Sequence, residues 1–241
     1  MVPEVHVGEL REVLNMLAAD FRAEATRAVV ERGCCSVALP GGSVAVECFP
    51  VLAGLPHEWC QLHFFWVDER AVPPTDSESN YSLAQALWFG PANVPIESIH
   101  RMPADDPDLT NAAAAYSDQL IRALGSPPRF DFVLLGVGPD GHVASLFPDR
   151  APVSDERQWV AAVMDAPKLP HARLTLTMPV LAGAERLVVV AFGKSKAEAL
   201  AAAVDHPNSS LPLSVALRRS RRPLVLADRA AASLMMSPHS D

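Results

Sequence analysis

The amino-acid sequence predicts an α/β fold in which a mostly parallel sheet has helices on both faces. Short apolar runs at residues 62–67, 132–135 and 186–192 are rich in β-branched and aromatic side chains, as is typical of strands buried on both sides. Stretches with helical spacing alternate with these runs. The 241 residues show no internal repeat and no long polar linker, so we expect one domain over residues 1–241, frayed after about residue 236.

Helices are expected in the first half of the chain at residues 10–29, 44–53, 81–89 and 107–124, with strands at 34–40 and 62–67. Gly33 suits the left-handed residue that ends the first helix, and Asp106 and Pro107 suit the N-cap and first residue of the last one. Pro50 lies inside the second helix, where we expect a kink or an early end. The proline-containing segments 72–80 and 90–106 are predicted to be connections.

Strands are expected in the second half of the chain at residues 132–135, 158–164, 173–177, 186–192 and 223–227. Ser195 and Glu198 form the capping-box pattern S-x-x-E, which predicts a helix from there to about residue 204. Asp228 follows the last strand and can cap a terminal helix.

The composition excludes several classes of function. The chain has 28 acidic and 20 basic residues, and a formal charge of −8 argues against non-specific binding to nucleic acid or to an anionic membrane. It has no apolar run long enough to cross a membrane and no signal-peptide pattern, so we expect a cytoplasmic protein. The four cysteines form no C-x-x-C pair, which favours buried free thiols over a metal site.

The segment from Phe130 to Pro148 is the strongest candidate for chemistry. A buried strand ends there in a glycine-rich loop that contains Asp140 and His142. Because ligands of open α/β sheets bind at the carboxyl ends of the strands, an acid and an imidazole in this position form a candidate catalytic pair. The alternative is a structural imidazole whose hydrogen bonds are satisfied within the loop.

Three further groups follow predicted strands and are candidates for anion binding. Gly41-Gly42-Ser43 lies between a strand and a helix, where backbone N–H groups and the helix N-terminus favour a phosphate, although a tight turn with a serine cap has the same pattern. Asp68-Glu69-Arg70 follows the strand at 62–67, and at least one of its side chains should face the same cleft, although a solvated charge cluster has the same pattern. Arg173 and Lys194 could complete a phosphate clamp, or each could be an ordinary surface charge.

Residues 136–141 match G-x-G-x-x-G, the pattern of a dinucleotide site. That site requires a long helix after the third glycine, whereas Pro148 leaves room for one or two turns. Asp140 would also place a negative charge where the pyrophosphate binds. We therefore interpret this loop as a turn that presents His142.

Five motifs occur in an order that resembles 6-phosphogluconolactonases and, in general layout, the related glucosamine-6-phosphate isomerases/deaminases. They are LPGGS, FFWVDERAVPPTDSESNYSLA, FDFVLLGVGPDGHVASLFP, RLTLTMPVL and VVVAFGKSKAEAL. The resemblance extends from the first helix to about Leu226. It implies a Rossmann-like fold and hydrolysis of 6-phospho-D-glucono-1,5-lactone, the second step of the oxidative pentose phosphate pathway, with no metal or cofactor.

The resemblance also implies roles for individual residues. His142 would be the general base that activates water and Asp140 would support it. The phosphate and sugar oxygens would be bound by Gly41, Gly42, Ser43, Asp68, Arg70, Arg173 and Lys194. Two departures from the family pattern are Val44, where threonine is common, and Pro50.

Two details favour the lactonase over the deaminase. Arg70 stands where deaminases usually have tyrosine, and Phe147 stands where they place a glutamate, five residues after the histidine, that assists ring opening. A serine-esterase mechanism lacks its G-x-S-x-G nucleophile. A sugar-phosphate sensor without activity is the alternative from another class, and the sequence leaves open a monomer or a small homo-oligomer.

Overall fold

The structure is a computed structural model that describes residues 2–56, 58–148, 150, 158–206 and 208–236. It contains a six-stranded sheet and a three-stranded sheet. The predicted fold class is confirmed, because the larger sheet is parallel at every pairing and has helices on both faces. The tail after residue 236 that was expected to fray lies outside the described residues.

The six-stranded sheet positions the segments that the sequence marked for function. Its strands, in spatial order, are β1 (Glu4–Gly8), β9 (Pro223–Asp228), β8 (Arg186–Ala191), β5 (Phe132–Gly136), β2 (Cys35–Leu39) and β3 (Leu62–Trp66). From β2 the chain proceeds to the edge strand β3, and from β5 it proceeds in the opposite direction to β8 and then β9, which lies beside the other edge strand, β1. The adjacent strands β2 and β5 therefore form a topological switch point, where ligands bind in open α/β sheets.

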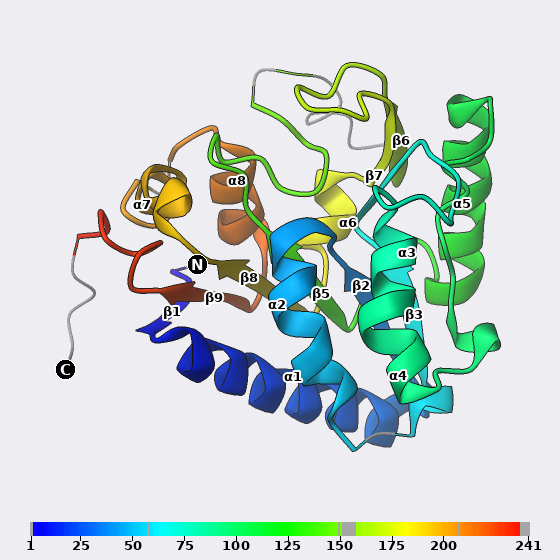
Figure 1. Ribbon diagram of the computed structural model, residues 1–241, viewed down its shortest axis with the longest axis horizontal. Coiled ribbons are helices and arrows are strands. Elements are labelled where there is room, and N and C mark those ends of the chain that lie inside the picture. The colour runs from blue at the N-terminus through cyan, green and yellow to red at the C-terminus, as the bar shows by residue number, and fades with distance from the viewer. Residues whose placement is uncertain (1, 57, 149, 151–157, 207, 237–241) are drawn as a thin grey trace.

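Helices cover both faces of this sheet, as Figure 1 shows. Helix α1 (Leu10–Arg32) packs with α2 (Gly42–Ala53) on one face. The shorter helices α6 (Met178–Ala182), α7 (Ala197–Val204) and α8 (Pro212–Arg219) lie on the opposite face, where α8 contacts the other two. Crossover connections that run in opposite directions along a sheet place their helices on opposite faces when all are right-handed, which explains this division.

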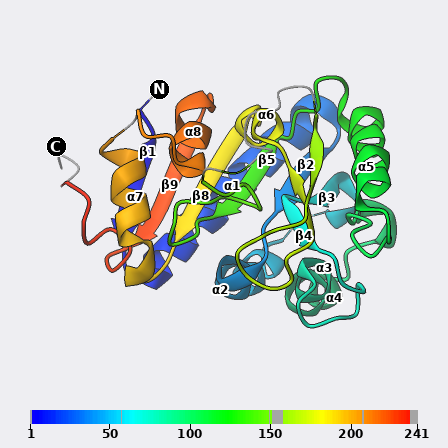
Figure 2. The ribbon, with the colours of Figure 1, turned by 90° about the horizontal axis from the view of Figure 1, so that it is seen from above.

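The remaining helices flank the smaller sheet. Helix α3 (Asn80–Ala84) continues through one π-helical turn (Gln85–Phe89) into α4 (Gly90–Ala92), and this composite helix packs against α2. Helix α5 (Leu109–Leu124) packs against strands of the smaller sheet. In Figure 2 that sheet lies between α3 and α5.

The three-stranded sheet corrects the expectation that all strands share one sheet. Its order is β4 (Asp68–Arg70), β7 (Arg173–Leu176) and β6 (Val160–Val163), and both pairings are antiparallel. Val67 connects the two sheets, because its N–H donates to Leu39 of β2 and its carbonyl accepts from Leu176 of β7. The segment after β3 therefore leaves the large sheet after one residue and becomes a strand of the small one.

A single cluster of buried apolar side chains packs against both sheets. Trp88 lies near its centre, with the rings of Phe21, Phe49 and Phe64 at centroid distances of 5.2–5.6 Å. Edge-to-face and tilted aromatic contacts of this kind add to the stabilisation from burial alone. The core therefore fixes the position of α2 and α3 relative to the sheet edge.

Several predicted boundaries were wrong, and local contacts give the reasons. Asp108, not Asp106, caps α5, because its carboxylate accepts from the N–H groups of residues 110 and 111. Ser195 does not open α7, since it lies inside a 3-10 turn (Lys194–Lys196) that precedes the helix. Helix α2, by contrast, ends at Ala53 as predicted, and Pro50 does not shorten it.

Elements at the two ends of the chain also differ from the expectation. Strand β1 and helix α8 were not predicted. Residues 229–235 form turns, not a helix, and the Asp228 carboxylate accepts from Ala231 and from Gly193. Asp228 therefore joins the ends of β8 and β9.

The cysteines are free thiols, as expected, but two of them are exposed. Cys35 and Cys48 are buried, and burial raises the pKa of both, to about 12 for Cys48. Cys34 and Cys60 are exposed because they precede their strands, in the turns that lead into β2 and β3. Among the described residues, no helix is long and apolar enough to cross a membrane.

Candidate functional site

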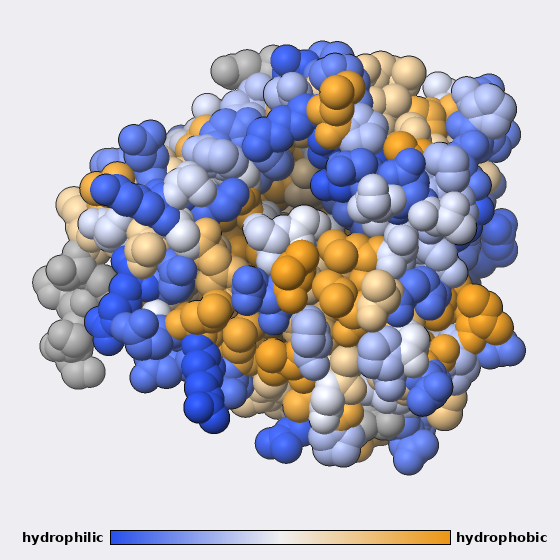
Figure 3. Space-filling model, in the orientation of Figure 1, coloured by the Kyte–Doolittle hydropathy of each residue, from blue (hydrophilic) through white to orange (hydrophobic). Residues whose placement is uncertain are grey.

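A cleft of about 540 Å³ opens at the carboxyl ends of β2 and β5. Residues 40–44, after β2, and residues 136–140, after β5, form two of its walls. Side chains from the small sheet form a third. Figure 3 shows the surface hollowed above the N-terminal end of α2. Of the predicted site residues, all except Lys194 line this cleft.

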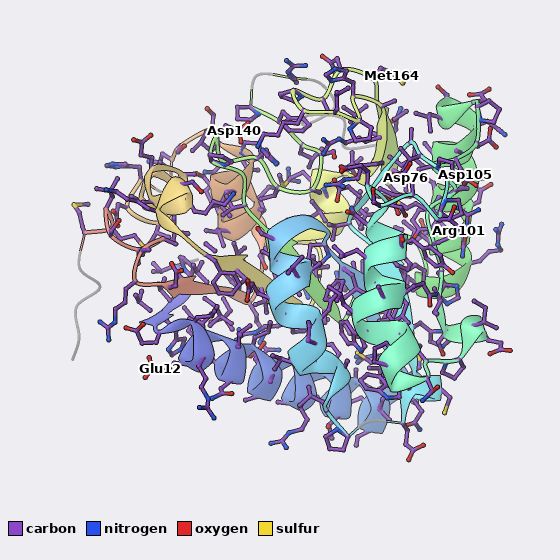
Figure 4. The ribbon with its side chains drawn as sticks, viewed as in Figure 1. Glu12, Asp76, Arg101, Asp105, Asp140 and Met164 are labelled. Atoms are coloured by element: carbon purple, nitrogen blue, oxygen red, sulfur yellow. The ribbon has the colours of Figure 1, made fainter. Side chains whose placement is uncertain are left out.

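His142 and Asp140 form a hydrogen-bonded pair on the loop that follows β5. Nδ1 of His142 lies 2.5 Å from Oδ1 of Asp140, and the backbone N–H of His142 donates to the same oxygen over 3.3 Å. An ionised carboxylate accepts only, so Nδ1 carries the proton and Nε2 presents its lone pair. No described residue forms a hydrogen bond with Nε2. Figure 4 shows Asp140 on this loop.

The electrostatics of the pair keep Asp140 ionised. Burial acts to raise the pKa of Asp140, but the charge and the hydrogen bonds of His142 outweigh it. The pKa of Asp140 therefore lies below its usual value. An ionised Asp140 fixes the tautomer of the imidazole and stabilises the imidazolium form when His142 takes up a proton.

The loop around the pair is closed on itself. Gly141 N–H donates to the Gly138 carbonyl, and Gly138 N–H donates to the His142 carbonyl. A Cβ atom at Gly138 would lie 2.0 Å from Nδ1 of His142, so only glycine leaves space for the ring. No helix follows within 143–148. The loop is thus a turn that presents His142, and the dinucleotide alternative lacks its helix.

Phe147 packs on His142 within the cleft. Its ring is 4 % exposed and its centroid lies 4.7 Å from that of the imidazole. The guanidinium carbon of Arg173 lies 5.9 Å from the same Phe147 ring. Deaminases place a carboxylate at this position. A phenyl ring transfers no protons, so Phe147 instead supports the imidazole by packing.

The two glycines at the start of α2, its N-cap Gly41 and its first residue Gly42, serve different purposes. Gly42 has φ +65°, a conformation that favours glycine, and a Cβ there would meet no atom within 4 Å. Gly41 has φ −110°, which any residue adopts, but a Cβ there would overlap the side chain of Asn80. Ser43 follows in the first turn of α2, where N–H groups lack partners within the helix. Val44 is buried at the edge of the cleft, and its Cγ2 methyl packs against the backbone of Gly136.

Asp68 and Glu69 point to opposite sides of β4. Asp68 lines the cleft, and its carboxylate accepts from the Ser145 hydroxyl over 2.6 Å. Glu69 is buried away from the cleft, where burial raises its pKa against the opposing effect of four hydrogen bonds. These bonds come from the N–H groups of Arg70, Asn80 and Tyr81 and from the Ser79 hydroxyl. Glu69 thus holds the start of α3 against β4.

Two arginines face each other across the small sheet. Arg70 of β4 is the direct partner of Arg173 of β7 in the antiparallel register, and both line the cleft. Nη1 of Arg70 donates to the backbone carbonyl of Glu78 and lies 3.7 Å from the carboxylate oxygen Oε2 of the same residue. Like charges in directly opposed positions destabilise a ladder. An anion between them would remove that repulsion.

Arg173 is the more buried of the two, at 6 % exposure. Its Nε and Nη2 atoms donate to the carbonyls of Pro170 and Lys168, each over 3.0 Å, and no ion pair joins it to a carboxylate of the described residues. Burial lowers the pKa of Arg173, and the charge of Asp68 partly opposes this shift. Arg173 thus positions the loop that carries Lys168, and it places at the cleft a positive charge that Asp68 offsets only in part.

The prediction for Lys194 was wrong, and Lys196 takes its place in the cleft. Lys194 is exposed and does not line the cleft, whereas Lys196 does. The reason is the 3-10 turn after Gly193, which moves the cleft-facing position two residues along the chain. Burial lowers the pKa of Lys196, and the charge of Lys168 adds to this shift while Asp140 opposes it.

Lys168, Lys196 and Asn80 are cleft residues that the sequence did not single out. The two lysines precede and follow strands from different sheets, so no local pattern connects them. Asn80 is the first residue of α3, directly after its N-cap Ser79, and no sequence pattern connects this position with the cleft. Among the described residues, no group of three or more His, Cys, Asp or Glu side chains could hold a metal ion.

Comparison with known proteins identifies the family. The family of glucosamine-6-phosphate isomerases/6-phosphogluconolactonase matches residues 9–225. The chain belongs to this family. A relative named 6-phosphogluconolactonase, from Mycobacterium tuberculosis, is 36% identical over 220 residues, which is 87% of this chain and 89% of that protein. The family resemblance predicted from the five motifs is therefore confirmed.

Solved structures of the glucosamine-6-phosphate isomerase/6-phosphogluconolactonase family share the fold. The 6-phosphogluconolactonase from Leishmania guyanensis has a TM-score of 0.84 and 26% identity, over 98% of this chain and 100% of that one. A monomeric glucosamine-6-phosphate deaminase has a TM-score of 0.80 and 23% identity, over 96% of this chain and 99% of that one. The fold therefore does not separate the two activities, and the site residues must do so.

Proposed function

We propose that this chain hydrolyses 6-phospho-D-glucono-1,5-lactone to 6-phospho-D-gluconate, the second step of the oxidative pentose phosphate pathway. The observation on which this proposal depends most is the Asp140–His142 pair in a cleft that two arginines and two lysines also line, with Phe147 in place of the deaminase glutamate. The names of the curated relatives support the same activity.

The reaction requires a base and a positioned water. Nε2 of His142 takes a proton from water while the oxygen attacks the lactone carbonyl carbon. The bond between that carbon and the ring oxygen then breaks, and the ring oxygen takes the proton back from His142 as it becomes a hydroxyl. The new carboxylic acid ionises. Asp140 holds the ring and stabilises the imidazolium form between these steps. No oxidant, metal or cofactor enters the balance.

The phosphate and sugar oxygens are assigned to groups on both sides of the cleft. Backbone N–H groups of Gly42 and Ser43 at the α2 N-terminus, with Gly41 before them, favour an anion through the helix dipole. Arg70 and Arg173 provide guanidinium groups that can bind two oxygens at once. Lys196 adds a charge that the sequence had assigned to Lys194. Asp68 accepts a hydrogen bond from Ser145 and lines the part of the cleft that we assign to the sugar.

Lactone hydrolysis separates this proposal from its alternatives. The purified chain is incubated with the freshly prepared lactone, and acid release is followed against the spontaneous rate, with ammonia release from glucosamine 6-phosphate measured in parallel. We expect accelerated lactone opening and no ammonia. Ammonia release without accelerated opening would establish the deaminase, and binding of 6-phosphogluconate without either reaction would establish a sensor.

The cytoplasmic location and the oligomeric state stay predictions. Cell fractionation tests the first. Light scattering of the purified chain distinguishes a monomer from a small homo-oligomer.

A further inference from the structure

The side chain of Asn80 lies between two walls of the cleft. Asn80 is the first residue of α3, is 1 % exposed and borders the cleft. Its backbone N–H donates to Glu69 over 2.8 Å, which fixes the start of the helix. The backbone from which the Asn80 amide extends is therefore held in place.

Contacts with Asp68 determine which way the amide points. Nδ2 of Asn80 donates to the Asp68 carbonyl over 2.9 Å and lies 3.3 Å from Oδ1 of Asp68. Both Asp68 atoms only accept hydrogen bonds, so the nitrogen must be on that side. The amide oxygen then points the other way, toward the loop before α2.

The amide oxygen is buried and has no N–H or O–H partner among the described residues. A Cβ atom on Gly41 would lie 1.7 Å from this oxygen and 2.2 Å from Cγ of Asn80. The oxygen is therefore in close contact with the Gly41 backbone, the geometry of a weak Cα–H···O interaction. An unpartnered buried carbonyl destabilises a protein, so its retention at the cleft points to a use there.

We propose that Asn80 is a positioning residue that locks the Gly41–Ser43 loop to β4, and that Gly41 must be glycine because of Asn80. Asn80 joins the two walls from which the anion is held, the N-terminus of α2 and the segment Asp68–Arg70. This inference rests on the proposed binding of a sugar phosphate in the cleft, but it concerns Asn80, to which no role was assigned above.

A double-substitution cycle tests the proposal. The variants are Gly41→Ala, Asn80→Ala and both together, and the measurements are KM and kcat for the lactone. Because the base lies on a separate loop, we expect Asn80→Ala to raise KM about tenfold with a much smaller effect on kcat. We expect Gly41→Ala alone to raise KM more than Asn80→Ala does, since the new Cβ would overlap the Asn80 side chain. In the Asn80→Ala background the same Gly41→Ala change should alter KM by at most about twofold.

Gly42→Ala is the matched control. Its strain comes from the positive φ and not from Asn80, so it should be equally harmful with and without Asn80→Ala. The proposal is overturned if Gly41→Ala remains as harmful in the Asn80→Ala background, or if Asn80→Ala lowers kcat and leaves KM unchanged. If Asn80→Ala does not fold, Asn80→Ser replaces it in the cycle with the same expected pattern.

A second readout separates this inference from the lactonase proposal. The shift in unfolding temperature caused by 6-phosphogluconate reports binding without any reaction. We expect the shift to shrink in Asn80→Ala and Gly41→Ala, with no additional loss in the double variant. If the lactone is not hydrolysed but this pattern holds, the activity is wrong and the role of Asn80 stands. Independent, additive losses in the shift would overturn the role of Asn80.

Discussion

The two sheets of this protein contribute differently to the cleft. The large sheet is parallel, is buried against helices on both faces, and supplies the Asp140–His142 pair and the loop before α2. The small sheet is antiparallel and supplies Arg70 and Arg173 in opposed positions. The candidate base thus belongs to one sheet, and the two opposed arginines belong to the other.

This division indicates which properties should change together. Substitutions on the loop after β5 should affect the chemical step, and substitutions on β4 or β7 should affect substrate binding. Substitutions among the ion pairs that connect α1 with the start of β9 should affect stability alone. Each prediction below tests one side of this comparison.

The largest effect is expected from His142→Ala. Removing the base should lower kcat by about 10²–10⁴-fold, with KM changing far less. The rate is measured as lactone opening above the spontaneous background. Asp140→Asn is the companion variant, because it keeps the shape but no longer fixes the tautomer, and a smaller loss is expected. Near-full activity of His142→Ala would remove the role of the base.

Arg173→Ala should act on binding. Loss of a buried guanidinium that faces an anion should raise KM by about 10–100-fold, with a smaller change in kcat. Arg173→Lys should recover only part of this, because the donors of a lysine lie on one nitrogen and cannot span the two loop carbonyls and the ligand as the guanidinium does. Arg101→Ala is the control, since Arg101 pairs with Asp105 near α5, apart from Asp140 in Figure 4. A pure loss of kcat in Arg173→Ala would contradict the division between the sheets.

Glu24→Gln should lower stability without changing activity. Glu24 on α1 forms ion pairs with Arg27 and with Arg222, which precedes β9, and its side chain is 7% exposed. Burial acts to raise the pKa of Glu24, but the two arginines outweigh it, so the pKa is lowered. This stabilisation is present above the pKa of the unfolded chain and is lost as pH falls through the folded-state pKa.

Chemical denaturation checks this prediction. At pH 7 the variant should lose about 1–3 kcal/mol of unfolding free energy, and the difference from the unchanged chain should shrink at acid pH. A difference that grows on acidification would contradict the sign of the shift. KM and kcat should stay unchanged under conditions where both proteins are folded.

The smallest effect is expected from a pair of lysines two residues apart. Lys196→Ala should raise KM by about 3–10-fold, because a half-buried charge is removed from the cleft. Lys194→Ala should have no measurable effect, because Lys194 is exposed outside the cleft. Both changes remove one positive charge, so a general electrostatic effect would raise KM equally in the two variants. Equal KM values would contradict the assignment of Lys196, in place of Lys194, to the cleft.

The large sheet was predictable because its strands are local apolar runs. The stretches around Phe132 and Val188 needed no knowledge of their partners. Two strands of the small sheet were expected, at residues 158–164 and 173–177, but their place in a second sheet was not predictable. The pairing of residues 68–70 with 173–175 depends on contacts across about a hundred residues of chain. Strand β1 was missed because it is short and only its last residue is buried.

The candidate site shows the same limit at finer scale. His142 and Asp140 are neighbours in sequence, so their pairing could be inferred directly. Lys196 was missed because a single 3-10 turn after Gly193 shifts the register by two residues. The reason for Gly41 was also missed, because its neighbour Asn80 is distant in sequence. Sequence reasoning located the cleft and not the contacts that shape it.

The opposed arginines have a consequence for motion. With the cleft empty, Arg70 and Arg173 repel each other across the ladder between β4 and β7. A bound phosphate replaces this repulsion with attraction to a shared partner. Backbone amides of β4 and β7 should then exchange hydrogen for deuterium more slowly when 6-phosphogluconate is present, while those of β5 and β8 should exchange at an unchanged rate. The small sheet thus opens more easily without its ligand, and occupancy of the cleft sets its rigidity.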